Sequence, residues 1–321
     1  MSPLPCWLCS SLGCASAVIT FDLLEPYLSA RTTNLATIDR MASVDLSAKS
    51  AVLHQTLRDC GSLMVAYSGG TDSAFLAFAA HRVLGDRMLA VIADSASLPR
   101  KELESALNLC ETLRIPLQIL HTNELSDPNY QQNDANRCFH CKDELFTAME
   151  SLRERLNFDA IAFGMNTDDG GEHRPGQTAA RNHRVLAPLV TAQLSKAEIR
   201  YLAQIAGLTV HDKPASACLS SRLAYGLPVT AERLAQVEQA EDLLHSMGFN
   251  QVRVRHHDTL ARIEIAREDL SRALDLTLLD SISISFKGLG FTFVTLDTQG
   301  YRSGSMNSLL PTSAITSAKH A

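Results

Sequence analysis

Hydrophobic and polar positions alternate in blocks through the first two thirds of the chain. Short apolar runs, typical of buried strands, are separated by longer stretches with the i, i+3, i+4 spacing of amphipathic helices. We predict strands at 64–67, 88–93, 117–121 and 160–164, and helices at 44–60, 74–84, 101–113 and 143–156, with a further capped helix opening at Ser195. Strands and helices that alternate in this way form a parallel sheet with helices on both faces.

Beyond residue 228 the pattern changes to that of a small α+β domain. We predict helices at 230–247 and 268–276, and strands at 251–256, 261–266, 281–286 and 291–296. The expected organisation is an extension (1–44), a doubly wound α/β domain (45–226), a smaller α+β domain (227–307) and a loose tail (308–321).

Composition narrows the class of protein. The chain has 321 residues, of which 45% are hydrophobic, so it is long and apolar enough to form the cores of two domains. The net charge of -6 argues against binding to nucleic acid or to an anionic membrane mainly through electrostatic attraction. No apolar run approaches the ~20 residues of a membrane span. The apolar N-terminal stretch with Cys6, Cys9 and Cys14 lacks the positive region of a secretory signal. We expect a cytoplasmic protein whose fold begins near Met41.

The strand at 64–67 runs into a loop that fits a phosphate. The loop consists of Ser68, Gly69, Gly70, Thr71, Asp72 and Ser73, and a helix follows it. Glycines let the backbone approach an anion, and the helix start supplies N–H donors and a positive dipole. The Lys of a Walker A loop is missing, as is the spacing of a dinucleotide fingerprint. The alternative is a strand-to-helix turn without a ligand.

Other polar residues follow neighbouring strands and should lie at the same edge of the sheet. Ser95 follows the strand at 88–93, where a nucleotide base could rest. Asn166, Asp168 and Asp169 follow the strand at 160–164 and could hold Mg²⁺, although they also suit ordinary turn capping. The polar segment 170–184, which contains Arg174, is predicted to be an active-site loop.

Three cysteines stand in settings that favour chemistry. Cys138 and Cys141 form a C-x-x-C pair at a helix start, which suits a redox disulfide, half of a zinc site or two ligands of an iron–sulfur cluster. Two incidental structural cysteines remain the alternative. Cys218 stands among small polar residues with Arg222 four positions on, which favours its thiolate over the buried role of most lone cysteines.

With these stretches in view, residues 47–307 resemble the LarE family of ATP-dependent sulfur transferases, which act in nickel-pincer cofactor biosynthesis. The resemblance rests on SGGTDS, NRCFHCK, FGMNTDD, HRPG, CLSSR and GYRSGSMN, the last two being the most specific. It implies the fold of the N-type ATP pyrophosphatases, also called the PP-loop or adenine nucleotide alpha hydrolase type. ATP and Mg²⁺ would activate a carboxylate of a pyridinium biscarboxylic acid mononucleotide as an acyl adenylate, and sulfur would then displace AMP to leave a thiocarboxylate.

The resemblance also implies two sources of the sulfur. In family members with one site cysteine, the residue matching Cys218 gives up its own sulfur and becomes dehydroalanine. The additional Cys138 and Cys141 resemble the other branch, where three cysteines hold a [4Fe-4S] cluster with one open iron. We therefore expect Cys138, Cys141 and Cys218 as cluster ligands, with sacrifice of Cys218 as the alternative.

Three residues of the C-terminal domain complete the predicted site. Arg253 and Arg255 share one strand face and resemble the family's substrate-phosphate arginines, although a solvated strand face would look the same. Glu241 is predicted as a ligand of a nearby metal site. The expected partners are the small-molecule substrate, further copies of the chain in a homo-oligomer and a downstream nickel-insertion enzyme. Competing functions are a tRNA thiolase, which the acidic charge disfavours, and a nucleotide-binding regulatory protein.

Overall fold

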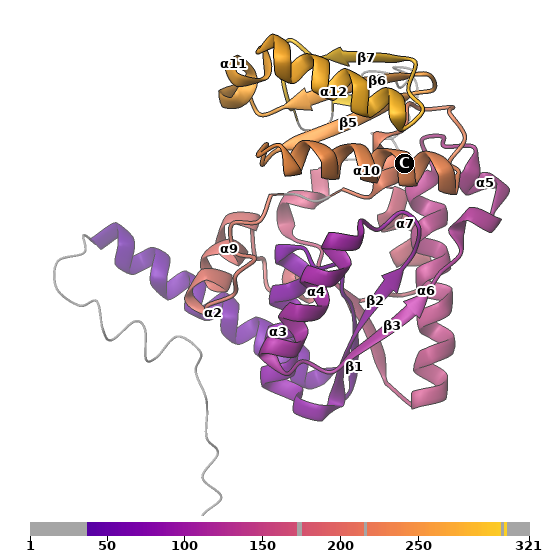
Figure 1. Ribbon diagram of the computed structural model, residues 1–321. Helices are drawn as coiled ribbons and strands as arrows, with labels where there is room; N and C mark the ends of the chain where they lie inside the picture. Colours follow the sequence, from indigo (N-terminus) through magenta and orange to yellow (C-terminus); the bar gives the residue numbers. More distant parts are fainter. Residues whose placement is uncertain (1–36, 172–174, 215–216, 303–304, 307–321) are drawn as a thin grey trace, which may run out of the picture.

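A computed structural model of the protein describes residues 37–171, 175–214, 217–302 and 305–306 (Figure 1). It shows a larger domain around strands β1 to β4 and a smaller one around β5 to β7. The predictions for Cys6, Cys9, Cys14, Arg174 and the tail from residue 308 fall outside the described residues. No helix among the described residues is long and apolar enough to cross a membrane.

The larger domain is built on a parallel sheet whose strands follow the predicted order. The sheet order is β3-β2-β1-β4, with β1 (Leu63–Ala66), β2 (Met88–Asp94), β3 (Leu117–His121) and β4 (Ala160–Phe163). All three strand pairs are parallel. The chain moves outward from β1 to β3 and then returns to the other side of β1, so a switch point lies between β1 and β4. Ligands of open α/β sheets bind beyond such a point.

Helices cover both faces of this sheet. One face packs against α2 (Thr37–Asp59), α3 (Thr71–Leu84), α4 (Arg100–Leu113) and α9 (Lys196–Ile205). The other face packs against α6 (Arg137–Leu156) and α7 (Pro175–Asn182). Alternate residues of β1 enter the two cores, Leu63 and Val65 on one side and Met64 and Ala66 on the other. The predicted doubly wound α/β class is confirmed.

Short elements connect these layers. They are η2 (Gly85–Arg87), η3 (Glu124–Ser126), α5 (Pro128–Gln131), η4 (Thr167–Gly171), α8 (Pro188–Thr191) and η5 (Leu219–Arg222). The helix predicted to open at Ser195 is confirmed as α9. Its start is a capping box, in which Ser195 accepts from the Glu198 backbone and Glu198 accepts from the Ser195 backbone.

The smaller domain has a three-stranded mixed sheet. Strand β5 (Val252–His257) pairs antiparallel with β6 (Leu260–Ile265), and β7 (Phe293–Leu296) pairs parallel with β6. Its core joins the sheet to α10 (Ala231–Ser246), α11 (Leu270–Ala273) and α12 (Leu276–Gly288). Between β6 and α11 the chain forms η6 (Arg267–Asp269), so the helix predicted at 268–276 is divided.

One predicted strand is wrong, because residues 281–286 lie inside helix α12. Serine alternates there with Ile282, Ile284 and Phe286, which imitates the period of a strand. In the structure Ile282 and Phe286, four positions apart, are buried, while Ile284 is 73% exposed. Buried residues four positions apart are typical of a helix. Packing against the small sheet therefore determined that this segment is helical.

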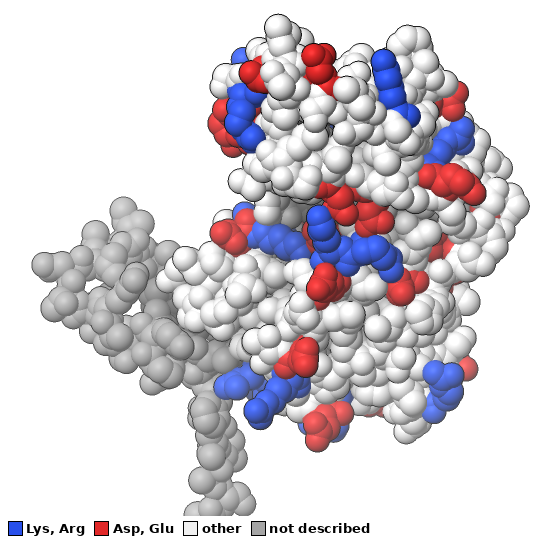
Figure 2. All heavy atoms as spheres, in the orientation of Figure 1, with Lys and Arg blue, Asp and Glu red and all other residues white. Residues whose placement is uncertain are grey.

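The two domains meet along α10, which Figure 1 shows between the small sheet and the larger domain. Charged side chains gather along this seam in Figure 2. There Lys101 pairs with Asp242 at 2.6 Å, and the Arg100 backbone donates to Glu238 at 2.5 Å. The backbone of Ala224 donates to the His256 carbonyl oxygen, so the segment before α10 extends the edge of β5.

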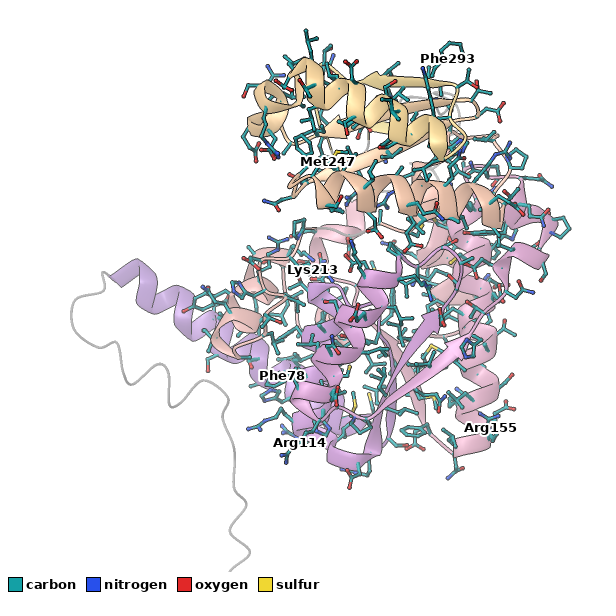
Figure 3. The ribbon with its side chains drawn as sticks, viewed as in Figure 1. Phe78, Arg114, Arg155, Lys213, Met247 and Phe293 are labelled. Carbon is teal, nitrogen blue, oxygen red and sulfur yellow. The ribbon has the colours of Figure 1, made fainter. Side chains whose placement is uncertain are left out.

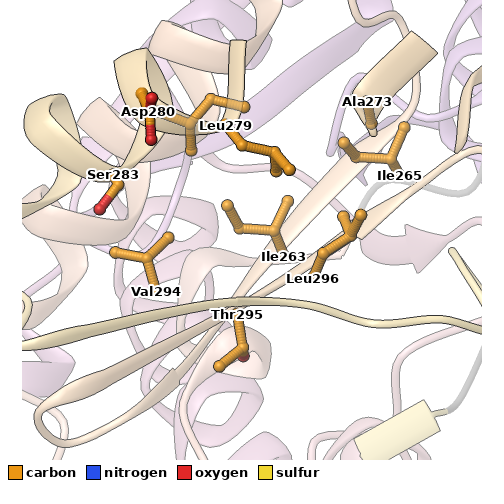
Figure 4. Close-up of a pocket in the computed structure, with 10 residues that line it drawn as sticks. Ile263, Ile265, Ala273, Leu279, Asp280, Ser283, Val294, Thr295 and Leu296 are labelled. Carbon is orange, nitrogen blue, oxygen red and sulfur yellow. The ribbon is translucent and has the colours of Figure 1, made fainter. Parts of the chain in front are cut away.

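A cavity of about 290 Å³ lies within the small domain, between α12 and strands β6 and β7 (Figure 4). Its lining is mainly apolar and includes Ile263, Ile265 and Leu279. None of the predicted site residues lines it. The cavity is therefore separate from the site described next.

Candidate active site

The loop after β1 requires glycine at its first glycine position. Gly69 has a φ of +72°, and a Cβ added there would lie 2.8 Å from the Cβ of Ala106 on α4. Gly70 has an ordinary φ of -80°, and its added Cβ would meet only the Ser68 hydroxyl, at 3.6 Å. Gly69 is therefore required by the backbone conformation. Gly70 instead leaves space for a ligand to approach the backbone.

The start of α3 is arranged to receive an anion. Its N-cap is Gly70, which has no side chain to bond the first N–H groups. The Ser73 hydroxyl accepts from the Ser68 backbone and contacts the Ser68 hydroxyl, both at 3.1 Å. The Thr71 hydroxyl instead donates to the Val210 carbonyl oxygen at 2.7 Å, so its role is structural. N–H groups without a side-chain cap at a helix start are suited to an anion such as a phosphate.

Gly164, at the end of β4, brings the second half of the predicted site against this loop. A Cβ added to Gly164 would lie 2.7 Å from the backbone nitrogen of Ser73. Only glycine permits that approach. The residues that follow, Asn166 to Asp169, are thereby held beside the start of α3.

Asp72 is the centre of the polar contacts at this edge. Its Oδ2 accepts from Lys196 Nζ at 2.5 Å and from Asn166 Nδ2 at 3.4 Å. Its Oδ1 is buried and has no hydrogen-bond partner among the described residues. A buried carboxylate oxygen without a donor is suited to a Mg²⁺ ion beside bound phosphates, because hard cations take oxygen ligands.

The three residues predicted to hold magnesium make hydrogen bonds within the turn after β4 and to the start of α9. Asp168 accepts from the Lys196 backbone at 2.9 Å, and the Asn166 side chain accepts from the Asp168 backbone at 2.9 Å. Asp169 accepts from the Asn166 backbone at 3.2 Å. These bonds cap the turn after β4 and the start of α9, so both interpretations of the cluster, capping and magnesium binding, stay open.

Two lysines that the sequence analysis did not assign flank the loop. Lys196 contacts Asp72, and Lys213, labelled in Figure 3, donates from Nζ to the Gly69 carbonyl oxygen at 3.2 Å. Lys213 also pairs with Glu102 at 2.6 Å. The available signals in the sequence were the place of Lys196 at the start of a capped helix and of Lys213 directly before Pro214. Ser95 lies half-buried at the end of β2, where its hydroxyl accepts from the Ser97 backbone.

The three predicted cysteines come together at the start of α6. Cys138 and Cys141 occupy its first turns, and Cys218 immediately precedes η5. Cys218 lies close enough to the other two for its charge to act on both thiols. Cys138 has an exposed side chain, but desolvation by its neighbours and then the Cys218 charge raise its pKa, while burial, opposed by Lys142, raises the pKa of Cys141 to about 12.

Cys218 differs from the other two. Burial opposes its ionisation, but the charge of Arg137 and a hydrogen bond with Ser220 bring its pKa below the ordinary value. Its sulfur lies 3.0 Å from the Ser220 hydroxyl. Tyr130, which is fully buried and bonded to Ser97 at 2.5 Å, also lies close enough for the Cys218 charge to raise its pKa, after burial. Of the three cysteines, Cys218 is the one whose pKa is lowered, which favours its thiolate.

The donor set suits an iron–sulfur cluster, because such clusters are bound by soft thiolates. Within the described part of the chain, no three His, Cys, Asp or Glu side chains already surround a position for a metal ion. A cubane is larger than one ion and spreads its ligands further apart. Cys138 and Cys141 stand one helix turn apart on α6 and Cys218 comes from the segment before η5, so the cluster remains a prediction that rests on the thiol donors.

Arg222 and Glu241 form a buried ion pair behind Cys218. Arg222 Nε and Nη2 donate to the two Glu241 oxygens, each at 3.1 Å, and the Val254 backbone donates to Glu241 at 3.0 Å. Arg222 also donates to the carbonyl oxygens of Ala217 and Cys218. The carboxylate is thus already matched by a cation, and a metal role for Glu241 stays a prediction without support from this geometry.

The two predicted phosphate arginines have different surroundings. Arg255 is buried and pairs with the fully buried Glu264 at 2.8 Å. Arg253 lies over the ring of Tyr301 at 5.4 Å, and the Arg222 charge, after burial, lowers its pKa. Arg253 makes no ion pair with a described carboxylate. It is therefore the better placed of the two to bind an anion beside the Cys218 segment.

Comparisons with known proteins show to which proteins the chain is similar. A model of the NAD synthase family matches residues 46–161, which include the loop after β1. The chain is 40% identical over 265 residues to an uncharacterized protein of Synechocystis sp., covering 83% of this chain and 99% of the relative. It is 35% identical over 266 residues to the pyridinium-3,5-bisthiocarboxylic acid mononucleotide synthase of Lactiplantibacillus plantarum, covering 83% and 96%. An uncharacterized protein of Methanocaldococcus jannaschii is 27% identical over 241 residues, covering 75% and 91%.

Proposed function

Since the chain belongs to the family of pyridinium-3,5-bisthiocarboxylic acid mononucleotide synthases, we propose that it transfers sulfur, with ATP, to a carboxylate of a pyridinium mononucleotide. One observation carries this proposal. Lys213 donates to the phosphate loop, and Cys218, five positions further along the chain, lies close enough to Cys138 for its charge to act there. This nearness supports neighbouring sites for carboxylate activation and sulfur transfer in one chain.

In the activation step a carboxylate oxygen of the substrate attacks the α-phosphorus of ATP, and the bond to the β-phosphate breaks. The N–H groups at the start of α3 would hold the departing pyrophosphate, with Lys196 and Lys213 close by. Asp72 would contribute its unbonded oxygen to Mg²⁺. The product is an acyl adenylate, whose AMP is a good leaving group.

In the transfer step a sulfur nucleophile attacks the acyl carbon, and the bond to AMP breaks to leave a thiocarboxylate. We propose that Cys138, Cys141 and Cys218 hold a [4Fe-4S] cluster, which when bound would supply sulfide for transfer without consuming the protein. Arg253 would bind the substrate phosphate from the smaller domain, because its guanidinium is committed to no described carboxylate. Arg222 would hold the Cys218 backbone in place.

Half-reactions test the proposal. With ATP and the pyridinium mononucleotide, the anaerobically purified protein should release pyrophosphate and form thiocarboxylate. Cys218→Ser should keep pyrophosphate release in a single turnover and lose the thiocarboxylate. Cys60→Ser, which changes a half-buried thiol bonded to Thr56 on α2, is the matched control and should keep both. Pyrophosphate release with tRNA in place of the mononucleotide would refute the proposed substrate.

The sulfur source is tested separately. Iron and acid-labile sulfide should be present in the wild type and fall in Cys138→Ser, and several turnovers should leave the mass of the chain unchanged. If the chain instead loses one H₂S at Cys218 after a single turnover, Cys218 is sacrificed and the cluster proposal is wrong. The activation step would stand in that case.

A further inference from the structure

Arg137, the first residue of α6, is a buried cation without a described carboxylate partner. The residue is 5% exposed. None of the ion pairs formed by described residues includes it, and its ionisable neighbours are Cys218, Cys138, Tyr130 and Tyr225, of which only Cys218 has a pKa below the ordinary value. An unpaired charge in the interior is costly, so natural proteins rarely keep one without a counter-charge. Here the candidate counter-charge is sulfur.

The guanidinium also joins segments that are far apart in the sequence. Nη1 donates to the Asn133 side chain and to the Ser220 carbonyl oxygen, the latter at 2.9 Å. The Tyr225 ring lies 5.8 Å from its central carbon, within the range of a cation–π contact. Arg137 thereby connects the start of α6, which carries Cys138, to η5, which directly follows Cys218.

Asn133 holds this arrangement from behind. It is fully buried and has a left-handed φ of 54°. Its side-chain Nδ2 donates to the carbonyl oxygens of Ala224 and Leu227, each at 2.8 Å. Its main-chain carbonyl oxygen accepts from the Gly226 backbone. Its side-chain oxygen is thus fixed in place to accept from Arg137. Four residues that follow Cys218 are thus bonded to Asn133 or Arg137, namely Ser220, Ala224, Gly226 and Leu227.

Building on the proposed function, we propose that Arg137 is a positioning residue for sulfur transfer. Its guanidinium fixes the Cys218 segment against the start of α6 and supplies the permanent positive charge that faces the sulfur of Cys138 and Cys218. A guanidinium keeps its charge at any working pH. The role therefore combines geometry with charge and needs no group to titrate. Lys would keep the charge at this position but lose the fork of hydrogen bonds.

The test compares Arg137→Gln and Arg137→Lys with Arg155→Gln. Arg155 is exposed near the opposite end of α6, about 27 Å along the helix, and is labelled in Figure 3. In single turnovers Arg137→Gln should slow thiocarboxylate formation about tenfold or more, as expected when a hydrogen-bonded charge is lost. Pyrophosphate release should stay within about twofold, which also shows that the variant is folded. Arg137→Lys should recover part of the loss, and Arg155→Gln should match the wild type.

A second readout uses the metal-free chain and needs no turnover. A short bifunctional thiol reagent should link Cys218 to Cys138 or Cys141 in the wild type and in Arg155→Gln. The linked fraction should fall severalfold in Arg137→Gln.

Two outcomes overturn the inference, and each is distinct from failure of the proposed function. Equal sulfur-transfer rates in Arg137→Gln and Arg155→Gln would show that the guanidinium does not act in transfer. Equal cross-linking in the two variants would show that it does not position Cys218. If the wild type itself releases no pyrophosphate with the mononucleotide, the proposed function fails instead, while the cross-linking result still decides the positioning role.

Discussion

The buried pair between Arg222 and Glu241 gives a prediction whose magnitude follows from the structure. The side chains are 2% and 9% exposed, and the pair has two hydrogen bonds with a third from the Val254 backbone. Glu241→Gln keeps the shape but leaves the Arg222 charge uncompensated. Breaking a buried pair in this way costs about 3–5 kcal/mol. Because urea slopes of small proteins reach about 3 kcal/mol per molar, the urea midpoint should fall by about 1 M or more.

The assay is urea unfolding followed by fluorescence and circular dichroism, with and without a chelator. Glu232→Gln, an exposed position on the same helix, is the control and should change stability by less than about 1 kcal/mol. The double variant Arg222→Gln with Glu241→Gln should recover part of the loss, because the unpaired charge is then gone. An unchanged midpoint in Glu241→Gln would refute the argument. A wild type that loses the same stability to the chelator would instead support the metal role predicted from the sequence.

Two further predictions concern the phosphate loop and His183, which follows α7 and contacts α6. Gly69→Ala should abolish ATP binding measurable by calorimetry, because φ is +72° at Gly69 and the added Cβ would clash with Ala106. Gly70→Ala should keep ATP binding, and equal affinities of the two variants would contradict the assignment of this loop to phosphate binding. Burial would lower the pKa of His183, but hydrogen bonds with Asp143 and Glu150 raise it overall. Stability from this group is full below about pH 6.5 and lost as pH rises through the raised pKa. The thermal midpoint should therefore fall between about pH 6 and about pH 8, and His183→Gln should fall less; parallel curves would exclude this origin.

The predictable parts of the fold were those set by local pattern. The strand before Ser68 is apolar throughout because β1 is buried on both faces, and a glycine pair before a helix start has few other uses. The segment 281–286 failed for the opposite reason. Its local pattern fitted a strand, and only the small sheet, formed by residues distant in the sequence, determined which side chains would be buried.

The candidate site shows the same division. Cys138, Cys141 and Cys218 were singled out by residue type and setting, and the fold brings them together. Arg137 stands beside Cys138 in the sequence but looks like any basic residue at a helix start. Its importance depends on its burial and on the Ser220 carbonyl oxygen, which no local pattern reveals. Likewise, Arg255 and Glu241 looked available for ligands until the structure showed their buried partners.

The distance along the chain between the cysteines has a consequence for how the protein is made. Cys218 follows Cys141 by about 80 residues, and chains are synthesised at about 5–20 residues per second. For roughly 4 to 16 s, therefore, a growing chain carries the first two thiols without the third. The bonds that hold the Cys218 segment also involve residues from Ala224 to His256, which emerge later still. The three-thiol site thus exists only after Cys218 and the residues that hold it have emerged, and metal that reaches the site earlier would find only two of its three thiols.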